Sequence, residues 1–352
     1  MKHVADATGY SITTVSAVLG GRADGLGIAE GTQAKIRAAA KELDYRPNLH
    51  ARSLRSRTTN LVGLMVPTLN NGFFSEMAET FERVARREGK LPLITVTNYD
   101  RKEERESLKY YLSQDVQCVF NANPTGIEEL VALCETSGTK QIFLDAPDTA
   151  RPTVATDNYE AGVVLTRVIL DSLGSDVRKG RIFFVGGMAD HEVTKLRLAG
   201  FRAALQEKGR RYSRELFLDT LFNAESAYQR IELLFRTHPD VVGMFVNSML
   251  PMDGLVRFFG EHPDLCRSVH YGVFDYHPMM ELLVNLHIAA VRQNPELMMH
   301  RAWEIFANPS ASHVDRIQYV PYTLIVAPTM RRFLPESPGV ALYQGHRRDF
   351  GS

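Results

Sequence analysis

The stretch that decides the fold is Val4-Ala5-Asp6-Ala7-Thr8-Gly9-Tyr10-Ser11-Ile12-Thr13-Thr14-Val15-Ser16-Ala17-Val18-Leu19. It consists of two short helical patterns separated by one glycine. Gly9 can take the left-handed conformation that turns the chain, and Ser11 can cap the second helix. This is the spacing at which a helix-turn-helix places its second helix in the major groove of DNA. The segment therefore predicts a DNA-reading unit at the start of the chain.

The periodicity of apolar residues indicates which side chains of this unit face its core. In the second helix we expect three residues to face inward: Val15, Val18 and Leu19. Four residues are then left pointing outward: Ile12, Thr13, Ser16 and Ala17. A third helix is expected from about Gly31 to Leu43, with a buried stripe made of Ile36, Ala39, Ala40 and Leu43. A three-helix unit is thus complete before Pro47.

Positive charge gathers at the same end of the chain. The 352 residues carry 41 Lys or Arg and 41 Asp or Glu, so the formal net charge is zero. Residues 1–58 alone carry nine Lys or Arg against five Asp or Glu. Either this is chance surface charge, or the basic end has an anionic partner that the rest of the chain does not share.

From Leu61 onward, short apolar runs alternate with amphipathic helical patterns. The expected strands are Leu61–Val66, Leu93–Thr97, Cys118–Asn121, Gln141–Leu144, Arg181–Val185, Val242–Val246, Ser268–Phe274 and Ile288–Val291. The expected helices include Phe73–Glu88, Glu103–Ser113, Tyr159–Leu173, Lys195–Lys208 and Pro295–Ala307. This alternation is typical of parallel, doubly wound sheets covered on both faces. About 275 such residues are more than a single hydrophobic core usually holds, so we expect an α/β fold with two lobes.

Amide, carboxylate and aromatic side chains recur just past the expected strands, where ligands of open parallel sheets bind. They are Asn70, Asn71, Phe73, Phe74, Asn98, Asn121, Asn123, Asp145, Asp190, His191, Asn247 and Asp275. Such groups pair with vicinal hydroxyls and cover the apolar face of a sugar, and Arg197 adds a planar fork of donors. The recurrence indicates a polyol or sugar cleft. Any one of these residues also fits as a turn former or helix cap, and the phenylalanines fit as core.

Other classes of protein find little support in the sequence. It contains no GxSxG, phosphate-loop, HExxH or dinucleotide motif, so we expect neither an enzyme nor a cofactor. Asp145 and Asp275 remain a remote alternative as an acid/base pair. Three scattered cysteines and eleven histidines show no metal-ligand spacing, so no metal is expected. Without an apolar leader or a membrane-spanning run, we expect a cytoplasmic chain with no membrane partner.

From about Val4 to Pro335, the sequence resembles the lac-repressor (LacI/GalR) family of bacterial transcription regulators. The motifs that carry the resemblance are Val4–Leu19, Leu43-Asp44-Tyr45-Arg46-Pro47-Asn48, Leu61–Pro67 with Asn71-Gly72-Phe73-Phe74, Arg197-Leu198-Ala199-Gly200-Phe201 and Val291-Arg292-Gln293-Asn294-Pro295. The loop Arg22–Gly27 and the region around Asn247-Ser248 are similar to the fructose-type members.

The resemblance implies roles for matching positions. Base or backbone contacts with DNA are implied for Ile12, Thr13, Thr14, Ser16 and Ala17, and for Asn48, Ala51 and Leu54 of a hinge helix. Leu54 matches the leucine that wedges into the minor groove. Effector contacts are implied for Phe73, Asp145, Arg197, Asn247 and Asp275. Ala17 departs from the family's frequent base-reading Arg, and a methyl group cannot read guanine.

The expected architecture is therefore a helix-turn-helix headpiece joined to a two-lobed, periplasmic-binding-protein-like effector domain. The expected segments are a DNA-binding domain 1–46, a hinge 47–59, an effector and dimerisation domain 60–335, and a tail 336–352. Within the effector domain, one lobe takes about 60–157 and 292–322, and the other 158–291 and 323–335. The predicted function is a homodimeric repressor of operator DNA controlled by a sugar or sugar phosphate. The alternative is a solute-binding receptor without DNA function.

Overall fold

The computed structural model describes residues 1–45, 59–146, 151–174, 180–278, 280, 286–308 and 316–331. Contacts divide the chain into two compact units, Met1–Thr59 and Asn60–Ser352. The hinge residues Asn48, Ala51 and Leu54 and the tail 336–352 lie outside the described residues.

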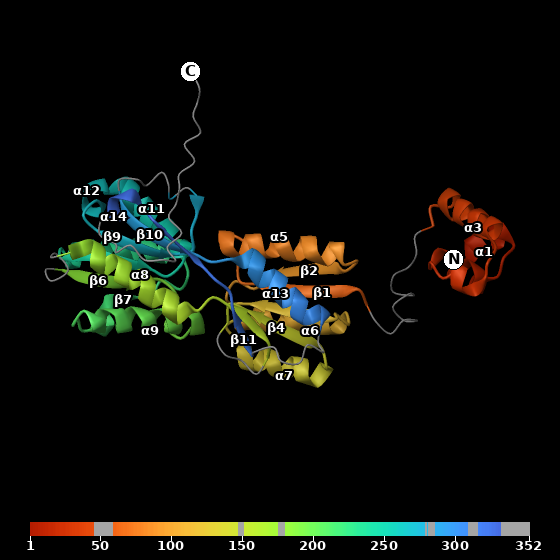
Figure 1. Ribbon diagram of the computed structural model, residues 1–352, viewed down its shortest axis with the longest axis horizontal. Helices are drawn as coiled ribbons and strands as arrows, with labels where there is room; N and C mark the ends of the chain where they lie inside the picture. The colour runs from red at the N-terminus through yellow and green to blue at the C-terminus, as the bar shows by residue number, and fades with distance from the viewer. Residues whose placement is uncertain are drawn as a thin grey trace, which may run out of the picture. The chain divides into compact units, whose positions relative to one another are not determined.

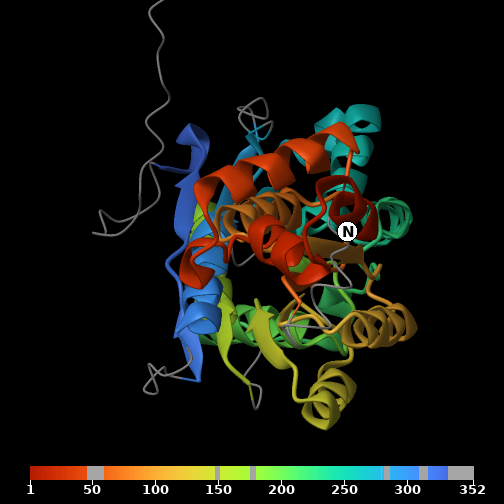
Figure 2. The ribbon, with the colours of Figure 1, turned by 90° about the vertical axis from the view of Figure 1, so that its right-hand side faces the viewer.

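The described residues 1–45 of the first unit form three packed helices, drawn red in Figure 2. They are α1 (Lys2–Thr8), α2 (Ile12–Leu19) and α3 (Glu30–Glu42), with the 3₁₀ turn η1 (Asp24–Leu26) between α2 and α3. Gly9 ends α1 at a φ of 72°, and the Ser11 hydroxyl accepts a hydrogen bond from the Thr14 N–H at the start of α2. The turn and the cap expected from the sequence are both confirmed.

The core of this unit is built largely from the residues expected inside it. Val15, Val18 and Ile36 are at most 2 % exposed, and Val4 of α1 packs in the same core. Leu43 was expected in the buried stripe but is 47 % exposed. This prediction was wrong because α3 ends at Glu42, so the helical spacing no longer sets the direction of the Leu43 side chain.

Two residues of α2 that we expected to point outward, Ser16 and Ala17, are buried instead. Ser16 and Ala17 are only 8 % and 3 % exposed within this unit. The chain after α2 folds back, the Arg22 N–H donates to the Ala17 carbonyl oxygen, and Ala23 joins the core. A helical wheel cannot foresee this returning loop. Ile12, at 47 % exposure, and Thr13 do point outward as expected.

In the second unit, the described residues form two six-stranded sheets, each at the centre of one lobe (Figure 1). The sheet of the first lobe has the order β11 (Ile317–Tyr319), β5 (Thr153–Ala155), β4 (Lys140–Leu144), β3 (Cys118–Ala122), β1 (Leu61–Val66), β2 (Leu91–Val96). The sheet of the second lobe has the order β12 (Thr323–Val326), β10 (His287–Arg292), β9 (His270–Phe274), β8 (Val241–Val246), β6 (Arg181–Val185), β7 (Phe217–Leu218). All neighbouring strands pair in parallel except β10 with β12, which are antiparallel.

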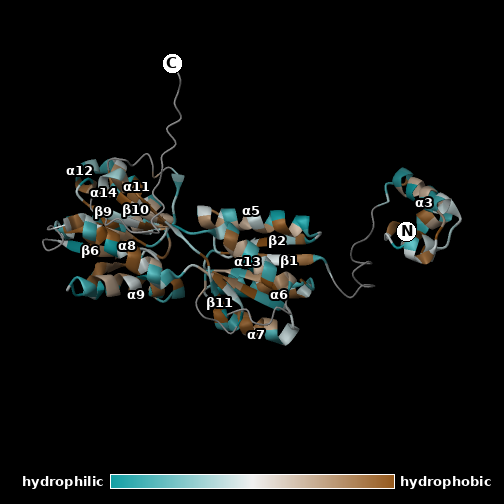
Figure 3. Ribbon diagram, in the orientation of Figure 1, coloured by the Kyte–Doolittle hydropathy of each residue, from teal (hydrophilic) through white to brown (hydrophobic). Residues whose placement is uncertain are grey.

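Helices cover both faces of each sheet, as the nearly continuous apolar strands predict. In the first lobe, α5 (Gly72–Arg87) and α13 (Pro295–Ala307) cover one face, and α6 (Arg101–Ser113) and α7 (Ile127–Ser137) the other. In the second, α8 (Asn158–Leu173) and α9 (Glu192–Glu207) oppose α10 (Ala224–Thr237) and α11 (Met249–Glu261). Figure 3 shows that the covering helices carry both hydrophilic and hydrophobic residues, as expected for helices with one face on a sheet. The short elements η3 (Arg214–Leu216), α12 (Pro263–Cys266) and α14 (Pro328–Arg331) complete the second lobe.

Within the described residues, the chain crosses between the lobes three times. The crossings follow β5, β10 and β11, and lead into α8, α13 and β12 respectively. They bring Asn158 and Gln293 to the junction of the lobes. This arrangement matters because the carboxyl ends of the parallel strands of both sheets meet at that junction.

Candidate functional site

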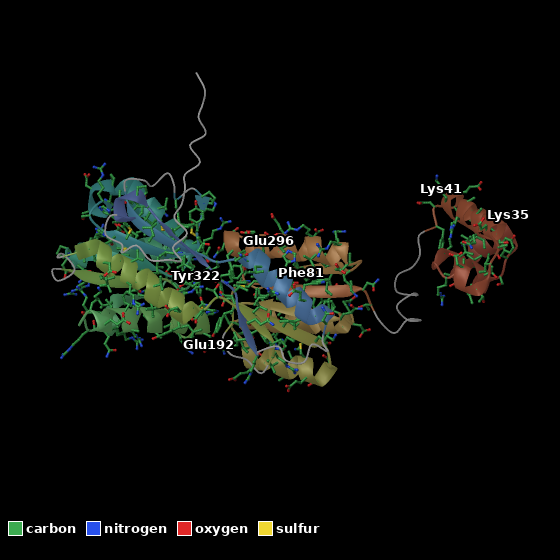
Figure 4. The ribbon with its side chains drawn as sticks, in the orientation of Figure 1. Lys35, Lys41, Phe81, Glu192, Glu296 and Tyr322 are labelled. Carbon is green, nitrogen blue, oxygen red and sulfur yellow. The ribbon has the colours of Figure 1, made fainter. Side chains whose placement is uncertain are left out.

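The first turn of α2 lies on the exposed surface of the first unit. The side chains of Ile12 and Thr13 are exposed, whereas that of Thr14 is half-buried. The Thr14 hydroxyl lies 2.9 Å from the Ser11 hydroxyl, which fixes the start of the helix. Lys35 and Lys41, labelled on α3 in Figure 4, are exposed on the same unit. The unit therefore presents a capped helix end and solvent-accessible cations.

Arg197 of α9 is the hub of a buried polar cluster between the two lobes. Its Nε donates to Asn158 Oδ1 at 2.8 Å and its Nη1 donates to the carbonyl oxygen of Asn247 at 2.6 Å. Its Nη2 lies 3.5 Å from Asp145 Oδ2, and both side chains are at most 4 % exposed. The guanidinium also lies 3.6 Å from the ring centroid of Phe274, a cation–π contact. Two nitrogens of the arginine fork thus donate hydrogen bonds, and the third faces a carboxylate.

Asp145 and Arg197 come from different lobes, so their ion pair spans the junction. Asp145 follows β4 and is also held by Asn158, whose Nδ2 donates to Asp145 Oδ1 at 2.7 Å. Burial raises the pKa of the Asp145 carboxyl above its ordinary value, against the opposing effect of Arg197. Burial likewise lowers the pKa of Arg197. Removing either partner would leave the other charge buried without compensation.

Asp275, which follows β9, anchors a second set of contacts across the junction. Its Oδ2 accepts from Asn71 Nδ2 at 2.9 Å, and its Oδ1 accepts from Gln293 Nε2 at 2.7 Å. Asn71 caps α5 of the first lobe by accepting from the Phe73 N–H. A cavity of about 170 Å³ lies beside this network. It is lined by Gly72, Phe73, Glu76, Asp275, Tyr276, His277, Pro278, Arg292, Gln293 and Pro295.

An aromatic group joins the lobes next to these polar residues. Tyr99, which follows β2, stacks on Phe222, which follows β7, with centroids 4.6 Å apart. The ring of His191 meets both edge-on, at 5.9 and 5.4 Å. Burial lowers the pKa of His191 to about 4, so its imidazole is neutral near pH 7. Burial, followed by the Asp275 carboxylate, raises the pKa of Tyr99.

The glycine pair after β6 allows close packing at the site. Gly187 has a φ of 81°, and a Cβ there would lie 2.3 Å from Thr194 Oγ1 and 2.5 Å from Asn247 Nδ2. Asn247 Nδ2 donates to Thr194 Oγ1 at 3.1 Å. The pair therefore serves to let α9 and the end of β8 approach each other.

The structure brings together Asp145, Arg197, Asn247 and Asp275, and it places Phe73 in the wall of the adjoining cavity and in the core of the first lobe. We name as the inter-lobe site these residues with Asn71, Tyr99, Asn158, His191, Phe222 and Gln293. Four of its members were not expected from the sequence: Tyr99, Asn158, Phe222 and Gln293. The sequence predicted Asn98 at this position, and the residue that lies in the site is its neighbour Tyr99.

Within the described residues, no three His, Cys, Asp or Glu side chains are grouped so as to hold a metal ion. None of the described helices is long and apolar enough to cross a membrane.

Family models match both units. Residues 1–48 match the bacterial regulatory proteins of the lacI family, and residues 62–307 match the periplasmic binding protein domain. The ribitol operon repressor of Klebsiella aerogenes is 34 % identical over 187 residues, which cover 52 % of this chain and 68 % of that protein. The fructose operon regulatory protein of Vibrio cholerae is 26 % identical over 93 % of this chain and 99 % of its own length.

Solved structures match the fold. A lacI-family transcriptional regulator from Silicibacter pomeroyi superposes with a TM-score of 0.77 at 23 % identity, and the match covers 94 % of this chain and 99 % of that one. The helix-turn-helix, the two-lobed unit and the related operon repressors agree with one another: this chain belongs to the lacI family of bacterial regulatory proteins.

Proposed function

We propose that this chain is a transcriptional repressor that binds operator DNA as a homodimer and is controlled by a sugar or sugar phosphate. The observation that carries the proposal is the presence, in one chain, of a capped helix-turn-helix and a buried inter-lobe site with charged residues from both lobes. A DNA-reading unit attached to a ligand site makes a switch. We place this switch in the cytoplasm, where the operator is.

The first turn of α2 is the proposed base-reading segment. Ile12 and Thr13 are exposed at its start, where recognition helices contact base edges. Thr14, close to the cap, suits a phosphate contact. Ser16 and Ala17 are buried in the unit, so we assign them a smaller share of recognition, through their backbone and the close fit of the helix. The buried methyl of Ala17 also favours an operator that does not depend on guanine at that position.

The hinge roles follow from the family alone. We propose that residues 47–59 form a hinge helix in which Asn48 and Ala51 contact DNA and Leu54 wedges into the minor groove. The other proposed segments are the DNA-binding domain 1–46, the effector and dimerisation domain 60–335, and the tail 336–352. In a homodimer, two such hinges and headpieces would read the halves of a pseudo-palindrome.

The inter-lobe site is the proposed effector site, with Asp145, Arg197, Asn247 and Asp275 as polar contacts and Phe73 in its wall. Contacts from both lobes support a ligand that closes one lobe on the other. Such a ligand controls DNA binding by its different affinities for the closed and open forms, and about 1.4 kcal/mol of difference shifts the balance tenfold.

The competing function is a solute-binding receptor that does not bind DNA. The match of residues 62–307 to the periplasmic binding protein domain fits it equally well. The lacI-family match of residues 1–48 favours the regulator instead. We propose no enzymatic activity, since the site's residues serve to hold a ligand rather than to form a nucleophile and base.

The test is selection of genomic DNA fragments by the full-length protein, followed by binding measured at several salt concentrations. A regulator selects one sequence class, and its affinity for that class falls steeply with salt because phosphate contacts release counterions. Failure to retain any fragment, combined with tight binding of a sugar, would establish the receptor instead.

A further inference from the structure

Some buried polar atoms at the inter-lobe site lack a hydrogen-bond partner, and those among them that have a fixed role are acceptors. Six amide or carboxylate oxygens among the described residues accept no hydrogen bond. Two of them, Asn121 Oδ1 and Gln141 Oε1, lie within strands β3 and β4 of the first lobe. The other four are at the inter-lobe site or, for Asn123, next to its His191: Asn123 Oδ1, Asp145 Oδ2, Asn247 Oδ1 and Gln293 Oε1. Their side chains are at most 6 % exposed. Carbonyl and carboxylate oxygens cannot donate, and buried polar atoms are normally satisfied. The site therefore calls for a partner rich in O–H or N–H donors.

Three hydroxyl groups just past the strands β5, β7 and β8 are also buried without a hydrogen-bond partner. They belong to Thr156, Thr220 and Ser248. A hydroxyl donates or accepts, and so does the neutral imidazole of His191, both of whose nitrogens lack a hydrogen bond. These groups adapt to a ligand hydroxyl in either role. The surplus of fixed acceptors is therefore what sets the preference.

The buried cation that could bind an anionic ligand, Arg197, already contacts other groups of the protein. Arg197 is the one Lys or Arg side chain that is buried within the described ranges. Its three nitrogens contact Asn158, the Asn247 carbonyl and Asp145. A phosphate at the site would take Arg197 from these partners and would also face the Asp145 and Asp275 carboxylates.

The adjoining cavity offers a phosphate no better environment. It contains Arg292, but Glu76 and Asp275 line the same wall. The N-terminal end of α5 is occupied there, since the Phe73 N–H donates to the Asn71 side chain. At about 170 Å³ the cavity is smaller than the roughly 300–1,000 Å³ of pockets for drug-sized ligands. A small ligand with little or no charge fits these surroundings.

We propose that the effector is an uncharged polyhydroxylated molecule, an open-chain polyol or a monosaccharide, and that the site discriminates against its phosphate esters. The inference rests on the proposed function, because it narrows the ligand class of the same site. Hydroxyl groups supply the donors that Asn123, Asn247 and Gln293 require. A phosphate supplies acceptors and negative charge to a site that already has a surplus of both.

The test is a set of matched pairs measured with the full-length protein at one pH and ionic strength. Ribitol is compared with ribitol 5-phosphate, D-fructose with fructose 1-phosphate, and D-allose with its 6-phosphate, by thermal shift and calorimetry. We expect at least one neutral compound to raise Tm and to bind at least tenfold more tightly than its own phosphate. A phosphate that binds more tightly than its parent, or a panel in which no neutral compound binds, overturns the proposal.

Asp145→Asn tests the acceptor argument directly, because it replaces one acceptor oxygen by a donor and removes one negative charge. The neutral ligand should lose at least tenfold in affinity, and the preference over the phosphate should shrink. Asp264→Asn makes the same change on a side chain that is 93 % exposed, and it should alter neither. An Asp145→Asn protein with the same ligand preference as the wild type would contradict the argument. If Asp145→Asn does not fold, the comparison of neutral and phosphorylated ligands on the wild-type protein tests the proposal alone.

DNA binding separates this inference from the proposed function. A protein that retains its selected DNA fragment but prefers a phosphate ester disproves only the neutral effector. A protein that ranks the pairs as expected but binds no DNA disproves the regulator and leaves the ligand class standing.

Discussion

Tyr99 and Phe222 stack across the junction of the two lobes, with ring planes only 11° from parallel and centroids 4.6 Å apart. Their backbones have φ values of 57° and 51°, and the residues before them, Asn98 and Leu221, have left-handed φ values of 53° as well. Left-handed conformations of non-glycine residues are unfavourable and persist only where the surroundings fix them. The stack is one contact that fixes these two loops while the lobes are closed.

Phe222→Ala should therefore weaken lobe closure and effector binding. Aromatic pairs contribute about 0.5–1.5 kcal/mol beyond their buried area, so we expect effector affinity to fall by about two- to tenfold. Calorimetric titration with the effector identified from the matched pairs checks this. Phe235→Ala, which breaks the Phe235–Phe258 stack between α10 and α11 outside the site, serves as the control. An unchanged affinity in Phe222→Ala would show that the stack forms without coupling to the ligand.

Arg197→Ala should be strongly destabilising, because Asp145 would be left buried with no counter-charge. Breaking a buried ion pair costs about 3–5 kcal/mol of unfolding free energy. The double variant Asp145→Ala/Arg197→Ala should recover part of this loss. Urea unfolding of the wild type, the two single variants and the double variant measures the coupling. Purely additive losses would mean that the 3.5 Å pair carries no interaction energy.

His191 should make the protein sensitive to acid. Burial lowers its folded-state pKa to about 4, below the ordinary value of 6.5. The unfolded chain thus binds a proton more readily, and the stabilising contribution of His191 is lost as pH falls from about 6.5 to 4. At about 1.4 kcal/mol per unit, the loss is roughly 3 kcal/mol.

His191→Gln removes this titration, so its unfolding free energy should change less between pH 6.5 and pH 4 than that of the wild type. Urea unfolding at half-unit steps of pH provides the comparison. Asp190, Glu192 and Arg197 also act on the ring and remain in the variant, so they cancel in the difference. Parallel pH profiles for the two proteins would exclude His191 as the source.

Ser11→Ala should weaken DNA binding while leaving the effector site intact. It removes the side-chain oxygen that caps α2, a change that costs about 1 kcal/mol of helix stability. Hydrogen exchange of the α2 amides should accelerate several-fold, and operator affinity should fall with it. Ser11→Thr keeps the capping hydroxyl and should behave as wild type. Loss of effector binding in Ser11→Ala would contradict the division into two units.

Much of the fold is readable in the sequence because its central strands are buried on both faces. The expected bounds of β1 and β6 coincide with the observed ones, as do those of α13. The strands β5, β7, β11 and β12 were not expected, since they contain only two to four residues. So short a segment has no periodicity, and its conformation is set by the neighbouring strand. The antiparallel pairing of β12 is likewise a tertiary property.

The same limit applies to the inter-lobe site. Asp145, Asn247 and Asp275 were expected because each directly follows a long apolar strand. Phe222 follows β7 and Asn158 follows β5, and neither strand was anticipated. Gln293 lies in a crossing between lobes, where no local pattern marks a ligand residue. Ser16 and Ala17 show the converse case, in which a helical pattern predicts exposure and a returning loop prevents it.

The most direct test of the account measures the affinity of the full-length protein for its selected operator by fluorescence anisotropy, with and without the effector. We predict that saturating effector changes the operator Kd of the wild type at least tenfold, whereas Asp145→Ala/Arg197→Ala, which leaves neither charge buried without its partner, still binds the operator but shows no change. An operator Kd that does not respond to any compound that binds the inter-lobe site would contradict control of DNA binding by that site.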